Sequence, residues 1–216
     1  PRALAWSFLK AVRLVMLISC PLYFGMVVTA YPLVETVFGS KWTEMSPFVA
    51  ILALAMPVMT LQILFTPANN ALGRPQVTAR TNMFGAVLMP VTFLIAIQYG
   101  VYGLAWGWVI AFPLLTIFTY MQSHRHIGIS ARELVQAVWP GLSASVAMAA
   151  VVYGVDQLLP DMIVYARLVL LVATGGLAYV GLLYILARPT LIEVIRLLVR
   201  RKPPEPSPAE LSAEQI

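Results

Sequence analysis

The sequence predicts an all-α integral membrane protein with six transmembrane helices. Of its 216 residues, 60% are hydrophobic and 11% are charged, and the mean hydropathy is +0.84. Soluble domains are about 45–50% apolar and about 25% charged, so this composition disfavours a soluble globular fold. Long uncharged stretches separate the charged residues. These stretches lack the period-two alternation that a transmembrane β-barrel requires.

Five uncharged stretches give the positions of the helices, and they contain 21, 29, 44, 22 and 20 residues. A helix needs about 20 apolar residues to cross roughly 30 Å of hydrocarbon, so four stretches hold one helix each. The 44-residue stretch holds two helices that meet at residues 98–103, where two glycines and two tyrosines favour a tight interfacial turn. The predicted helices cover about residues 14–34, 47–68, 81–98, 103–120, 137–155 and 168–187, within a transmembrane region of residues 1–188.

The lysines and arginines predict the orientation. With the N-terminus in the cytoplasm, the cytoplasmic segments hold 12 of these residues and the outer segments hold 2. This asymmetry follows the positive-inside rule, which also accounts for the net charge of +5. We therefore expect a multi-pass protein of a lipid bilayer with both ends of the segment in the cytoplasm, and no nucleic-acid partner.

Local signals refine the helices. Ser130 and Glu133 form a capping-box pattern that starts a helix, and Pro140 allows a bend before the fifth span. The pairs Gly103/Gly107 and Gly141/Ser145 place small residues four apart, which favours close helix packing within the chain.

The C-terminal residues divide into two parts. Residues 189–202 predict an amphipathic helix on the cytoplasmic membrane surface, and residues 203–216 predict a disordered polar tail. The chain begins with Pro1 rather than Met, so we expect a piece of a longer protein.

Motifs of catalysis are missing from the sequence, so we expect no enzyme activity, no cofactor and no metal. His124 and His126 are spaced i, i+2, which does not place both on one helix face, and we interpret them as loop residues. No charged residue lies at the centre of a predicted span. The polar residues at membrane depth include Gln62, Asn69 and Asn70.

Four segments resemble a known family, and they occur in the family's order over about residues 1–190. They are residues 32–42 (PLVETVFGSKW), 70–75 (NALGRP), 99–106 (YGVYGLAW) and 128–134 (GISAREL). They resemble bacterial polysaccharide flippases of the multidrug/oligosaccharidyl-lipid/polysaccharide exporter superfamily, and above all the lipopolysaccharide and colanic-acid exporters.

The resemblance implies a fold and a function. Such flippases have 12–14 helices in two lobes, so this chain resembles the C-terminal part and would need the missing N-terminal lobe as its partner. The implied function is to flip undecaprenyl-pyrophosphate-linked oligosaccharide repeat units across the bacterial inner membrane by alternating access, for lipopolysaccharide and exopolysaccharide biosynthesis. Two alternatives stay open: a membrane enzyme of the same pathway, which should carry a large outer loop, and a non-transporting membrane scaffold.

The substrate site follows from the implied diphosphate, which requires cations. Arg74 and Arg80 are the basic residues of the cytoplasmic turn between the second and third helices. We predict that they receive the lipid-linked oligosaccharide, with Asn69, Asn70 and Gln62 as hydrogen-bonding neighbours. The other interpretation is that both arginines only fix the topology.

Overall fold

The computed structural model describes residues 2–160 and 162–186, and every element in these two ranges is helical. The amphipathic helix predicted for residues 189–202 and the tail predicted for residues 203–216 lie outside the described residues. The α-helices are α1 (Arg2–Val28), α2 (Ala30–Phe38), α3 (Ser46–Ala71), α4 (Pro75–Ala96), α5 (Gly100–Ile127), α6 (Ala131–Leu158) and α7 (Val164–Leu186), with the 3₁₀ helices η1 (Ser40–Met45) and η2 (Ile97–Tyr99) between them.

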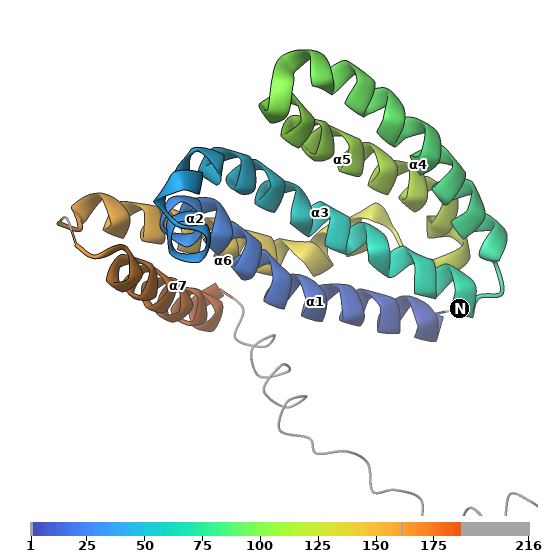
Figure 1. Cartoon of the computed structure of the whole chain (residues 1–216). Helices are drawn as coiled ribbons and strands as arrows, with labels where there is room; N and C mark the ends of the chain where they lie inside the picture. Colours follow the sequence, from blue (N-terminus) through green and yellow to red (C-terminus); the bar gives the residue numbers. More distant parts are fainter. Residues whose placement is uncertain (1, 161, 187–216) are drawn as a thin grey trace, which may run out of the picture.

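Five helical stretches in the described ranges are long and apolar enough to cross a membrane, which confirms an all-α, multi-pass organisation. One of them, Pro75–Ile127, is 53 residues long and contains both α4 and α5. The chain reverses inside it at η2 and Gly100, whose φ of +73° suits glycine. The turn predicted at residues 98–103 is therefore confirmed, and Figure 1 shows α4 and α5 as two helices lying side by side.

The first predicted helix, residues 14–34, has the wrong bounds. The helix α1 begins at Arg2 and ends at Val28, and α2 follows from Ala30. The early start escaped a prediction based on uncharged residues, because Lys10 and Arg13 lie within α1. The break has a local cause: Pro32 has no N–H to donate to the carbonyl of Val28.

The junction between α5 and α6 corrects one prediction and confirms another. His124 and His126 lie in the last turn of α5 and not in a loop. Gly128, at φ +78°, ends that helix in the left-handed conformation. Ser130 and Glu133 form both hydrogen bonds of the predicted capping box, and α6 continues through Pro140 to Leu158.

The long helices alternate in direction, which gives the bundle two distinct ends (Figure 1). One end carries the start of α1, the α3–α4 turn at residues 72–74 and the α5–α6 turn at residues 128–130; we call it the basic end. The other carries η1, the α4–α5 turn at residues 97–103, and residues 159–160 and 162–163; we call it the aromatic end. Residues 2–13, 74–80 and 125–132, which are predicted as cytoplasmic, thus gather at the basic end, and the described residues predicted as external gather at the aromatic end; the C-terminal segment predicted as cytoplasmic lies outside the described residues.

The bundle has two buried clusters, one between α1, α3, the end of α5 and the start of α6, and one between α1, α6 and α7. Leu17, Met148, Val152 and Leu171 are buried together in the second. The helices α1 and α6 come close to each other at Gly141, where an added Cβ would lie 3.0 Å from the carbonyl oxygen of Met16. The small residue predicted at this position therefore does serve packing within the chain.

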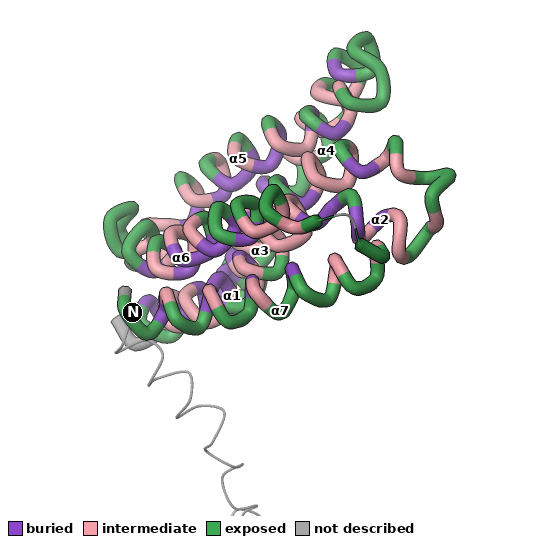
Figure 2. The backbone as a smooth tube through the Cα atoms, turned by 90° about the vertical axis from the view of Figure 1, so that its left-hand side faces the viewer, coloured by how far each residue is buried: buried purple, intermediate pink, exposed green. Residues whose placement is uncertain are grey.

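The α4–α5 hairpin is attached to this core through α3 and α5. Gly107 faces Ala96 and Phe93 across the hairpin, and the rings of Phe84 and Phe118 stack with centroids 4.1 Å apart. Outside these contacts the hairpin presents large apolar side chains to its surroundings, and Figure 2 shows exposed residues along much of α4. In a bilayer this surface would contact lipid or another protein segment.

Candidate functional site: two ends of the bundle

Four of the five predicted site residues lie in or near the α3–α4 turn at the basic end: Asn69 and Asn70 at the end of α3, Arg74 in the turn, and Arg80 in α4. Gly73, at φ +66°, and the backbone bonds from Gly73 N–H to the Asn70 oxygen (2.9 Å) and from Arg74 N–H to the Asn69 oxygen (3.0 Å) shape the turn. Arg74 lies at the N-terminal boundary of α4 and Arg80 lies in its second turn; both residues are exposed. The turn therefore presents two cations at the end of the bundle.

The amide of Asn69 does not face this turn. Asn69 is 1% exposed, and its Nδ2 donates a 2.9 Å hydrogen bond to the hydroxyl oxygen of the fully buried Ser123 on α5. Its Oδ1 is buried without a hydrogen-bond partner in the described structure. The contact joins α3 to α5, so the structure places Asn69 between helices rather than at a surface open to a ligand.

The remaining two amides are in different surroundings. Asn70 is exposed, and its Oδ1 accepts a 3.2 Å hydrogen bond from the hydroxyl of Thr78, which ties the turn to α4. Gln62 is half-buried about two turns further into α3. The structure thus brings Asn70, Arg74 and Arg80 to one end but does not gather all five residues around one cavity.

A second cationic feature at the basic end was missed by sequence reasoning. Trp6, Lys10 and Arg13 line a cavity of about 170 Å³ along α1. The Lys10 Nζ lies 4.8 Å from the centroid of the Trp6 ring, a cation–π distance. The sequence could have indicated this feature, because the i, i+4, i+7 spacing of the three residues places their side chains on one helix face.

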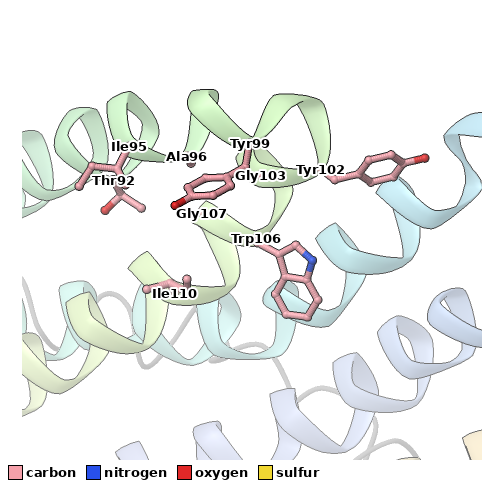
Figure 3. Close-up of a pocket in the computed structure, with 9 residues that line it drawn as sticks. All are labelled: Thr92, Ile95, Ala96, Tyr99, Tyr102, Gly103, Trp106, Gly107 and Ile110. Carbon is pink, nitrogen blue, oxygen red and sulfur yellow. The ribbon is translucent and has the colours of Figure 1, made fainter.

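The aromatic end contains a cavity between the tips of α4 and α5, with a volume of about 500 Å³ (Figure 3). Tyr99, Tyr102 and Trp106 line it together with the hydroxyl-bearing Thr92. Gly103 closes the tip, and an added Cβ there would collide with the carbonyl oxygen of Ala96. The lack of a side chain at Gly103 thus lets the start of α5 lie directly against the end of α4.

A neighbouring cavity of about 550 Å³ lies where α1, α2, η1 and α3 meet the start of α5. Tyr31, Thr43, Glu44 and Tyr102 are among the residues that line it. Tyr102 belongs to both cavities. Its hydroxyl donates a 3.3 Å hydrogen bond to the backbone oxygen of Glu44, which lies 58 residues earlier in the chain.

Sequence reasoning identified the tyrosines at residues 99 and 102 only as interfacial anchors. Aromatic residues at a membrane interface are common, so their presence did not distinguish an anchor from a binding surface. The pairing of Tyr102 with Glu44 depends on how α5 lies against α3, and no local pattern in the sequence encodes it.

A third apolar cavity, of about 490 Å³, lies between α1, α6 and α7. Gly25, Gly175 and Gly176 line part of it. Among the described residues, no group of three or more His, Cys, Asp or Glu side chains is arranged to hold a metal ion. The polar chemistry that the described helices expose therefore lies at the two ends of the bundle.

Comparison with known proteins gives one match. Residues 1–47, which cover α1, α2 and η1, match the sequence profile of a family described as polysaccharide biosynthesis protein. No curated protein matches the chain, and no solved structure matches it. The first part of this multi-pass membrane protein is thus similar to polysaccharide biosynthesis proteins, which indicates a role in polysaccharide biosynthesis.

Proposed function

We propose that this chain is part of a flippase that moves undecaprenyl-pyrophosphate-linked oligosaccharide repeat units across the bacterial inner membrane, for lipopolysaccharide or exopolysaccharide biosynthesis. The observation that carries the proposal is the match of residues 1–47 to polysaccharide biosynthesis proteins within a bundle of helices able to span a membrane. A flippase of such a pathway must move a charged, hydrated headgroup past roughly 30 Å of hydrocarbon. The proposal assigns this chain transport and no covalent step.

The proposed membrane arrangement has six spans. Of the two arms of the hairpin, α4 has 22 residues and α5 has 28, and about 20 residues suffice to cross the hydrocarbon core. The other four spans would come from α1 together with α2, from α3, from α6 and from α7. The alternating direction of the helices then puts the whole basic end on one side of the membrane. The excess of Lys and Arg assigns that side to the cytoplasm.

The proposed mechanism is alternating access between this helical unit and a second lobe. A cavity between the lobes would open to each side in turn, while the lipid tail stays in the bilayer. The exposed arginines at residues 74 and 80 would receive the diphosphate on the cytoplasmic side, where guanidinium groups can form paired, charge-assisted hydrogen bonds. The exposed amide of Asn70 would add a hydrogen bond.

The test measures transport in the full-length protein reconstituted in liposomes. We expect the double variant Arg74→Ala/Arg80→Ala to flip the lipid-linked repeat unit at about a tenth of the normal rate per inserted molecule, because the diphosphate loses two cationic partners. The pair Arg74→Lys/Arg80→Lys should lie between this variant and the unmodified protein, since Lys keeps the charge but not the paired geometry.

The matched control uses two other exposed arginines of the basic end. Arg125→Ala/Arg132→Ala removes the same charge from the α5–α6 junction, and its transport per inserted molecule should stay normal. If both alanine pairs reduce only insertion, the arginines at residues 74 and 80 act as topology determinants. If the unmodified protein moves no lipid-linked oligosaccharide, the transport proposal itself fails.

A further inference from the structure

The shared wall between the two cavities of the aromatic end points to a ligand site. Tyr102 is 49% exposed, and its ring borders both hollows while its hydroxyl is held by the backbone of Glu44. An aromatic anchor at a membrane interface normally directs its hydroxyl to water or lipid headgroups. Here the hydroxyl instead bonds another helix boundary, so the ring has a fixed position with an exposed surface.

The groups around this ring combine two kinds of chemistry. On one side are Tyr99 and Trp106, which are 76% and 48% exposed, and on the other are the ring of Tyr31 and the carboxyl-bearing Glu44. Flat apolar surfaces fit the C–H faces of pyranose rings. Carboxylate and hydroxyl oxygens accept hydrogen bonds from sugar hydroxyls. Mixed lining of this kind, apolar walls with a few polar groups, is typical of ligand pockets.

We propose that Tyr102, with the aromatic residues Tyr99, Trp106 and Tyr31 and the carboxyl group of Glu44, forms a binding site for sugar residues of an oligosaccharide. The inference rests on the proposed function, because that function supplies the oligosaccharide. The negative charge of Glu44 selects neutral and amino sugars over acidic ones, since an acidic sugar would place a second carboxylate beside it.

The position of the site fits a separation of tasks between the two ends. Arg80 and the tip at Tyr99 lie at opposite ends of α4, whose 22 residues span about 33 Å at 1.5 Å per residue. Diphosphate recognition at the basic end and sugar recognition at the aromatic end therefore use different residues. They can be tested independently of each other.

The experiment measures binding of lipid-free oligosaccharides to the purified full-length protein in lipid nanodiscs. The probes are a panel of repeat-unit oligosaccharides released from bacterial surface polysaccharides, grouped as neutral, amino-sugar-containing and uronic-acid-containing. Saturation-transfer NMR gives the affinities. We expect neutral and amino-sugar members to bind, and uronic-acid members to bind at least several-fold more weakly.

Three variants test the named groups. Tyr102→Ala should weaken binding about tenfold, because it removes the central ring. Tyr102→Phe keeps the ring but loses the bond to the Glu44 backbone, so binding should change by no more than about threefold. Glu44→Gln should raise the affinity for uronic-acid-containing oligosaccharides toward that of the neutral ones. The fold should stay intact, since the side chain keeps its shape. Glu44→Gln also keeps the test valid if Tyr102→Ala unfolds the hairpin, because its change in selectivity does not depend on removing the Tyr102 ring.

Two other exposed tyrosines are the matched controls. Tyr153 and Tyr165 are 58% and 62% exposed near the α6–α7 connection, and neither borders the two cavities that share Tyr102. Replacing either by Ala should leave affinity unchanged. An equal loss in these controls, or a panel in which no oligosaccharide binds, would overturn the site. Transport without oligosaccharide binding refutes the site alone, whereas binding without transport refutes the proposed function alone.

Discussion

The helix α6 and the α4–α5 hairpin are both apolar enough to span a membrane, yet they are packed very differently. Seven of the 28 residues of α6 are buried, whereas α4 has three buried residues among 22; the other arm of the hairpin, α5, has nine and packs against α3. Along α6, small residues such as Gly141, Ala144 and Ser145 are buried against neighbouring helices. Along the hairpin, large side chains such as Val87 and Ile117 are exposed. The difference shows that residue size and helix position, rather than apolar content, decide which segment belongs to the core.

The largest expected effect comes from enlarging the tightest contact of the packed region. Gly141→Leu forces α1 away from α6, because even a Cβ would lie 3.0 Å from the Met16 oxygen. We expect a loss of about 3 kcal/mol in the free energy of unfolding, measured in mixed detergent micelles. Gly154→Leu on the same helix is the control, since nothing lies within 4 Å of its added Cβ. Equal stability of the two variants would contradict the packing of α6 on α1.

A smaller and local effect is expected in the hairpin. Gly103→Ala places a methyl group against the Ala96 carbonyl oxygen and 2.7 Å from the Tyr99 Cβ. The turn should distort at a cost of about 2 kcal/mol, and amide exchange should accelerate in residues 93–107 while α1 and α6 stay protected. Gly176→Ala, which meets nothing within 4 Å, provides the reference. Faster exchange throughout the bundle would show that hairpin and core unfold as one unit.

The smallest effect concerns the buried polar contact that joins the hairpin to α3. Ser123→Ala leaves both amide atoms of Asn69 without a partner, since its Oδ1 already lacks one. We expect a loss of about 1 kcal/mol. The double variant Asn69→Leu/Ser123→Ala removes both partners together and should be nearly neutral relative to the unmodified protein. Thermal unfolding in nanodiscs compares the two variants, and a larger loss for the double variant than for Ser123→Ala would show that the amide has a further partner.

Much of the helix plan could be predicted from local sequence. The reversal at residues 98–103, the capping box of Ser130 and Glu133 and the packing role of Gly141 all depend on neighbouring residues or on residue size, and the structure confirms them. The bounds of the first helix could not be obtained from uncharged residues alone. Lys10 and Arg13 are compatible with a helix, and Pro32 sets the break.

The candidate sites show where local information ends. The sequence by itself determined that Arg74 and Arg80 lie beside one turn, because they are only six positions apart along the chain. Only the tertiary structure decided that Asn69 bonds Ser123, 54 residues away, and that Tyr102 meets Glu44, 58 residues away. Helices form through hydrogen bonds between residues four apart, so their positions are encoded locally. The contacts of Asn69 and Tyr102 depend on how α3 and α5 pack along their whole length, and that packing is a property of both helices together.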